Sequence, residues 1–136
     1  MEPNLALQAA IRARLVASTA VVALVPATSI KDANGVPATF PCILLGEGQT
    51  VPGGNIARTS HEVFADLHIW QKESGLAFSK QVTGAIRGAL TDSRWNVPGL
   101  HVADLHVTSS RFLRDPGGQH SHAVLSLSAI VLETAP

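Results

Sequence analysis

The chain has 136 residues, and at this length a single domain buries about two thirds of its unfolded surface without disulfides. Ten basic and ten acidic residues give a net charge of zero with no basic block, which excludes nucleic-acid binding driven by a positive face. Charged residues make up only 15% of the chain, against about 25% in typical soluble proteins, so we expect either an apolar, partner-binding surface or a merely alanine-rich composition.

The N-terminal segment predicts an amphipathic helix over residues 4–17. Its apolar positions recur every fourth residue: Leu7, Ile11 and Leu15. Arg12 and Arg14, followed by an apolar stretch, also imitate a secretory signal, which is the alternative interpretation. We prefer the helix, because its apolar face begins before the arginines and Glu2 precedes it, as the helix dipole favours. A short helical turn over residues 20–25 follows, and no apolar run approaches the length of about 18 residues that spans a bilayer.

The next segment predicts a pair of strands. A brief strand is expected near Ile30, followed by a turn at Asn34-Gly35. The first long strand covers residues 40–47, and Pro41 at its start is typical of an edge strand because proline donates no ladder hydrogen bond. The second covers residues 61–70, where apolar residues alternate with charged and aromatic ones. One face of this strand is therefore expected to join the core.

Residues 46–60 are rich in glycine and are expected to protrude from the sheet. Unstructured connections of this length are uncommon in compact domains and are usually functional. The alternative is that both strands continue into a hairpin with its turn at Pro52-Gly53-Gly54. In either case the segment is predicted to be a contact arm, with Arg58 near its base as a charged rim contact. The residues predicted for interfaces lie in this arm and on the outer side of the next helix: Thr50, Val51, Ile56, Arg58, Lys80 and Arg87.

The second half predicts a helix and a closing hairpin. Apolar residues at helical spacing mark residues 75–90 as a helix. Two alternating runs, residues 100–113 and 121–132, flank Asp115-Pro116-Gly117-Gly118, which reverses the chain. We therefore expect one α+β domain over residues 1–136, in the order α-β-β-α-β-β, with a mainly antiparallel four-stranded sheet, helices packed on one face and a long projecting hairpin loop. The expected core is Leu7, Ile11, Leu15, Val63, Leu67, Ile69, Phe78, Val82, Ile86, Leu125 and Leu127.

No catalytic, cofactor-binding or metal-binding motif stands out. There is no serine elbow, no phosphate-binding loop and no His-Glu-x-x-His pattern, so we expect no enzyme activity, no cofactor and no metal. The histidines are His61, His68, His101, His106, His120 and His122. His120 and His122 share one strand face and would chelate a metal only if His68 or His106 aligned with them, so structural or interface roles are favoured. The single cysteine, Cys42, excludes an internal disulfide and lies in an apolar run typical of a buried position.

Three local strings, in this order, resemble a known family. They are residues 40–46 (FPCILLG), 68–75 (HIWQKESG) and 114–125 (RDPGGQHSHAVL). With the opening helix and its short following turn, they cover nearly the whole chain. On these strings and their order, the sequence resembles the tail-terminator (tail-completion) proteins of tailed bacteriophages and gene transfer agents. It departs from the family pattern in the segment 46–60, which is longer and contains more glycine than the corresponding segment usual in the family.

The resemblance implies an α+β subunit that forms a ring, typically a hexamer, on the head-proximal end of the tail tube. Such a ring halts tube polymerisation and joins tail to head, so the implied partners are further copies of the chain, the tail tube protein and the head-tail connector or stopper. DNA would pass through the lumen without sequence-specific binding. The implied location is the virion tail or neck, assembled in the bacterial host cytoplasm. Two alternatives remain: a small-molecule enzyme or binding module on a split α+β sheet, and another neck or tube component.

Overall fold

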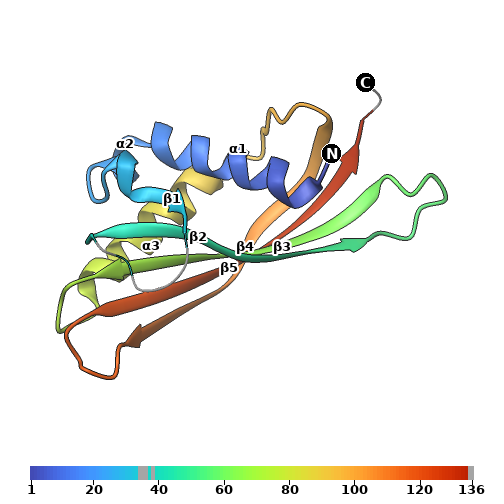
Figure 1. The fold of residues 1–136 in the computed structure, drawn as a ribbon. Helices are drawn as coiled ribbons and strands as arrows, with labels where there is room; N and C mark the ends of the chain where they lie inside the picture. Colours follow the sequence, from blue (N-terminus) through green and yellow to red (C-terminus); the bar gives the residue numbers. More distant parts are fainter. Residues whose placement is uncertain (34–36, 38, 135–136) are drawn as a thin grey trace.

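The helical and alternating apolar patterns produce one β-sheet with all helices on one of its faces (Figure 1). The computed structural model describes residues 1–33, 37 and 39–134, so the turn predicted at Asn34-Gly35 lies outside the described residues. The fold is α+β, as predicted. In chain order the elements are α1 (Pro3–Ala17), α2 (Thr19–Val22), the 3-10 turn η1 (Ala27–Ser29), β1 (Ile30–Asp32), β2 (Cys42–Pro52), β3 (Ser60–Gln71), α3 (Ala77–Leu90), β4 (Leu100–Arg114) and β5 (Ser121–Glu133).

The sheet has five strands in the order β1-β2-β3-β5-β4. β1 pairs with β2 in parallel, and the other neighbouring pairs are antiparallel. The predicted four-stranded sheet and the order α-β-β-α-β-β are therefore corrected, because α2 and β1 are additional elements. The brief strand expected near Ile30 is confirmed, and it joins the sheet. A tertiary contact holds it there, since the Arg12 Nε on α1 donates to the Ile30 carbonyl oxygen over 2.8 Å.

The core lies between the helices and the sheet face that they cover. Alternate residues of β5 from Ser121 to Val131 are buried, which confirms the period-two pattern of this strand. The predicted core residues that are buried are Leu7, Ile11, Leu15, Val63, Leu67, Ile69, Val82, Ile86, Leu125 and Leu127. Phe78 is only half-buried at the edge of the core, because it lies in the first turn of α3. Among the fully buried residues that the predicted core omitted, Val21, Val25 and Ile30 lie in segments too short to show a period, and Ile43 lies in a run of buried residues on β2 that shows no alternation.

Local hydrogen bonds set the limits of the first two helices. The Glu2 carboxylate accepts a hydrogen bond from the backbone N–H of Asn4 over 2.7 Å, and Pro3 occupies the first helical position. Ser18 ends α1, and its hydroxyl oxygen accepts from the backbone N–H of Val21 over 3.3 Å to start α2. The chain therefore turns between two helices within a single residue.

β2 and β3 form one long hairpin. Their pairing runs from Cys42 with Trp70 to Pro52 with His61, so the turn contains only residues 53–59. The hairpin alternative for the glycine-rich segment is therefore confirmed, and the long irregular loop is not formed. The strands continue because residues with high strand propensity, such as those just before Pro52, lie between the glycines.

One extra residue in β2 interrupts this pairing. Leu45 pairs with Leu67, and Gly48 pairs with Ala65, so the two intervening residues of β2 lie opposite Asp66 alone. This is a β-bulge, and beyond it the alternation of side chains along β2 is shifted by one position. The bulge therefore decides which face of the hairpin each later residue of β2 occupies.

Candidate functional site

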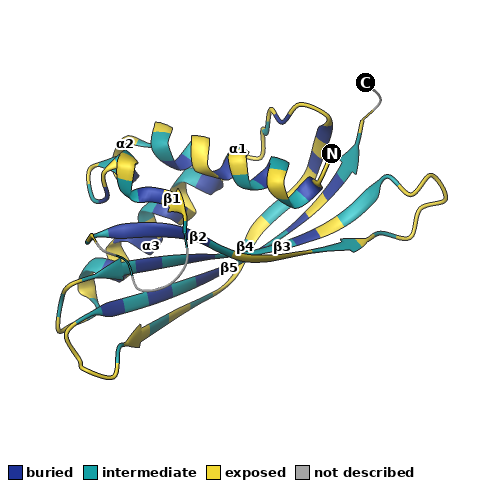
Figure 2. Cartoon of the chain, viewed as in Figure 1, coloured by how far each residue is buried: buried dark blue, intermediate teal, exposed yellow. Residues whose placement is uncertain are grey.

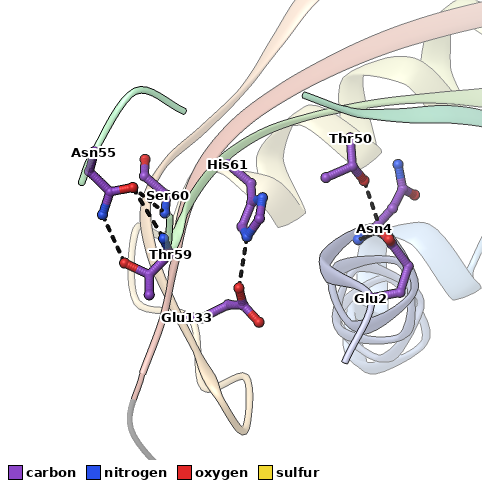
Figure 3. A network of polar contacts seen from close by, with 8 residues as sticks. All are labelled: Glu2, Asn4, Thr50, Asn55, Thr59, Ser60, His61 and Glu133. Carbon is purple, nitrogen blue, oxygen red and sulfur yellow. Dashed lines mark hydrogen bonds and ion pairs between the residues drawn. The ribbon is translucent and has the colours of Figure 1, made fainter. Parts of the chain in front are cut away.

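The tip of the β2–β3 hairpin projects beyond the rest of the molecule, and its residues are largely exposed (Figures 1 and 2). Asn55 organises the turn: its side-chain oxygen accepts from the backbone N–H groups of Thr59 and Ser60, both over 3.1 Å (Figure 3). Its amide also donates to the Thr59 hydroxyl over 2.8 Å. Ile56 is 100% exposed, and Arg58 has a left-handed backbone conformation with φ of 56°. A hydrogen-bonded turn thus presents one large apolar side chain and one guanidinium to solvent.

The base of this arm is braced from both sides (Figure 3). On one side the Thr50 hydroxyl donates to the Glu2 carboxylate, the N-cap of α1, over 2.8 Å. On the other side the Glu133 carboxylate on β5 lies 2.9 Å from the His61 Nε2. The backbone N–H of Asn4, and after it the Thr50 hydroxyl, hold the pKa of Glu2 below its usual value. The arm is therefore fixed to the helical layer and to the sheet, and only its tip stands free.

The four interface residues predicted in the arm have different positions. Ile56 and Arg58 share the tip and are both exposed, so the expectation that Arg58 lies near the base of the arm is wrong, because the strands continue up to the turn. Thr50 is half-buried and braces the arm, so its hydroxyl is already used within the subunit. Val51 pairs with Glu62 and is half-buried on the sheet face opposite the helices. The tip and the rest of the arm are thus two separate surfaces.

The other two predicted residues, Lys80 and Arg87, lie on the exposed side of α3 and not beside the arm tip. The Lys80 ammonium lies 5.5 Å from the centre of the Phe112 ring, near the end of β4. Arg87 borders a surface cavity of about 500 Å³, together with Leu105 and His106 of β4. This cavity between a helix and the outermost strand is a second candidate contact region.

The sheet face opposite the helices is the third candidate region. α1, α2 and α3 all lie on the other face, and no helix in the described part of the chain covers this one (Figure 1). It carries the half-buried aromatic residues Phe64 and Trp70 on β3. Ile130 on β5 is 44% exposed, and Leu113 on β4 is 37% exposed. Apolar side chains gathered on an uncovered face are typical of a surface that another protein covers.

A cluster of polar side chains lies on this open face beside the bulge of β2. The His68 Nδ1 lies 2.8 Å from the His122 Nε2, and the His68 Nε2 lies 3.1 Å from the Glu47 carboxylate. Trp70 stacks on His122, with ring centres 3.9 Å apart and planes inclined by 11°. Burial lowers the pKa of His122 to about 4, and the neighbouring His68 adds to this effect. His68 and His122 therefore do align, whereas His120 lies in the β4–β5 turn.

The sequence prediction did not connect Glu47 and Asp66 with this cluster. Asp66 and His68 are two residues apart on one strand, and this spacing places both side chains on the same face. Glu47 carries no comparable signal, because only the bulge brings it opposite Asp66. A search for carboxylate and imidazole side chains two residues apart on one strand would have found Asp66 and His68 but not Glu47.

Cys42 is not suited to nucleophilic chemistry. Its side chain is fully buried, and burial raises the pKa of its thiol. It is a small buried side chain on β2, as the apolar run around it predicted. In the described residues, none of the helices combines the length and the apolar character needed to cross a bilayer.

The chain matches known proteins in both sequence and fold. The family model described as "Tail completion protein gp17" matches residues 9–132. A chain from the virion of a native gene transfer agent (GTA) particle aligns with a TM-score of 0.81 and 20% identity over 93% of this chain and 94% of that chain. The gp17 protein of bacteriophage SPP1 aligns with a TM-score of 0.63 and 16% identity over 93% of this chain and 88% of that chain, while no curated protein matches by sequence. The chain therefore belongs to the tail completion protein gp17 family, and its role is that of a structural virion protein in tail completion.

Proposed function

We propose that this protein is a tail terminator, which forms a ring on the head-proximal end of the tail tube. In this proposal the ring is a hexamer that stops tube polymerisation and joins the tail to the head-tail connector or stopper. It belongs to the neck of a phage or gene transfer agent virion, is assembled in the bacterial host cytoplasm and has no enzyme activity. Membership of the tail completion family supports this role.

The braced arm is the observation that carries the proposal. Subunits of a closed ring meet through heterologous contacts, so each subunit needs two different surfaces. The arm tip with Ile56 is one such surface, and the open sheet face with Trp70 and Phe64 or the outer side of α3 supplies the other. Because the arm is fixed at its base, little conformational freedom is lost when its tip docks.

We also propose that DNA passes through the ring without sequence-specific binding. The chain carries no net charge, so it lacks the excess of basic side chains that neutralises phosphates. A chain without such an excess is compatible with a passage that DNA crosses without adhering.

The first test removes the tip of the arm. Residues 54–59 are replaced by Asn-Gly, which connects two antiparallel strands in a tight two-residue turn flanked by the hydrogen-bonded pair Gly53 and Ser60. We expect unchanged circular dichroism and melting of the subunit, because the residues paired below Pro52 are retained, and loss of the ring in sedimentation velocity. A ring that forms normally would contradict the role of the arm, and an unfolded subunit would show that the tip belongs to the fold.

The second test separates a terminator from another neck or tube component. Purified protein is added to tail tubes while they elongate in vitro, and tube lengths are measured by electron microscopy. We expect elongation to stop and density to appear at one end of each tube. Tubes that continue to grow, or that incorporate the protein along their length, would favour a connector or tube subunit.

A further inference from the structure

Three potential metal ligands from two strands converge on the open sheet face. Glu47 lies on β2, and Asp66 and His68 lie on β3; one ligand atom of each is within 4.8 Å of the other two. In the part of the chain that the structure describes, this is the only such group of three. Glu47 and His68 border a surface cavity of about 370 Å³, and Glu47 and Asp66 border a second one of about 210 Å³, so an ion can enter and water can complete its coordination.

The backbone is shaped to allow this convergence. The bulge places Gly46 and Glu47 together opposite Asp66 and thereby turns the Glu47 side chain toward the same face. At Gly46 a Cβ atom would lie only 2.5 Å from the His68 ring. The position next to Glu47 therefore has to lack a side chain if the imidazole is to occupy its present place.

Neighbouring side chains orient two of the three ligands. The His68 Nδ1 contacts the His122 Nε2 over 2.8 Å, and His122 is itself stacked on Trp70. The hydroxyl of Ser126 donates to an Asp66 carboxylate oxygen over 2.9 Å. Protein metal sites have such outer hydrogen bonds, which fix the tautomer of a ligating histidine and the direction of a ligating carboxylate.

The charges of the three side chains favour binding of a cation. With its Nδ1 engaged by His122, His68 directs its Nε2 toward the Glu47 carboxylate, 3.1 Å away. Asp66 adds a second negative charge to the same small region. A divalent ion balances two carboxylates, and an imidazole among the ligands favours a first-row transition metal over magnesium or calcium.

We propose that Glu47, Asp66 and His68 bind one divalent transition-metal ion per chain, with zinc as the representative ion. Small rotations, chiefly of the exposed Glu47, bring the three ligand atoms to about 2.0–2.2 Å from a common centre, and water completes the coordination. The ion links β2 to β3 at the bulge, where their regular pairing is interrupted. The sequence favoured no metal because these ligands match no metal-binding motif, and only the fold brings Glu47 to Asp66 and His68.

The test is zinc titration of the full, untagged chain by isothermal titration calorimetry. We expect one bound Zn²⁺ per chain, and at least tenfold weaker binding in Glu47→Gln and in Asp66→Asn, since each replacement keeps the shape of the side chain and removes its charge. The matched control is Asp104→Asn. Asp104 lies 2.9 Å from the His106 Nδ1, in an exposed pair to which the described residues add no third ligand. We expect this control to bind zinc as the parent does.

Each other outcome would overturn the proposal. If the parent binds no zinc, the three side chains form only a cluster of polar contacts. If Glu47→Gln and Asp66→Asn bind zinc normally, or if Asp104→Asn weakens binding equally, the zinc is held elsewhere. Displacement of zinc by an equimolar amount of magnesium would contradict the assignment to a transition metal.

Two further measurements accompany the titration. Circular dichroism of each variant checks that the fold is retained. Co²⁺ titrated into the same proteins should give visible absorption bands in the parent and the control but not in the two ligand variants.

Discussion

Ile56 at the tip of the arm allows a direct test of the proposed assembly. Its side chain is 100% exposed, so Ile56→Ser removes no packing within the subunit and should change the free energy of unfolding by less than about 0.5 kcal/mol. If a neighbouring molecule covers this side chain, its burial stabilises each contact by about 1.5–3 kcal/mol. Since about 1.4 kcal/mol corresponds to a factor of ten, the dissociation constant of each contact should rise about ten- to hundredfold.

Sedimentation velocity over a range of concentrations measures the association, and urea denaturation measures the stability of the subunit. Leu5→Ser is the matched control, because Leu5 is 64% exposed on α1 and lies outside the arm. We expect this control to leave both quantities unchanged. If Ile56→Ser assembles at the same concentration as the parent, the tip is not a contact. If Ile56→Ser lowers the stability of the subunit, the tip is not independent of the fold.

Ile86→Ala leaves a cavity in the core beneath α3 and should lower the free energy of unfolding by about 2–5 kcal/mol in urea denaturation. Glu2→Ala removes the N-cap of α1 and the hydrogen bond that braces Thr50. It should lower the free energy of unfolding by about 0.5–2 kcal/mol, measured by thermal unfolding. The Asp115 carboxylate is paired with the His120 ring and accepts from the His120 backbone N–H, and these contacts hold its pKa below the usual value. The folded state therefore binds this proton less readily than the unfolded state, so the stabilisation is complete above about pH 4 and is lost as the pH falls through the lowered pKa. Asp115→Asn should accordingly flatten the acidic limb of the stability curve, and an unchanged limb would contradict the assignment.

Much of the fold could be predicted because its long elements carry a clear period. The alternation in β5 and the four-residue spacing in α1 predicted which side chains are buried, and the structure confirms both. β1 could not be placed in the sheet, since three residues show no period and a hydrogen bond from Arg12 holds the strand. The number of strands was therefore underestimated for a tertiary reason.

The candidate site was predictable only in part, and for a similar reason. The concentration of glycine predicted a protruding segment, and Ile56 and Arg58 do lie exposed at its tip. The bracing role of Thr50 could not be anticipated, because its partner is 48 residues away in sequence at the start of α1. Glu47 was missed because an irregularity in strand pairing has no signature in the hydrophobic pattern.

The bulge in β2 also decides how the arm responds to a change in chain length. Because Gly46 and Glu47 together lie opposite Asp66, deletion of Glu47 would leave Gly46 opposite Asp66 and would keep the pairing of Thr50 with Val63. Thr50 would still face Glu2, so the brace at the base of the arm would be retained, whereas the carboxylate beside His68 would be lost. A one-residue deletion at this point would thus remove one side chain from the open sheet face and leave both surfaces of the arm in place.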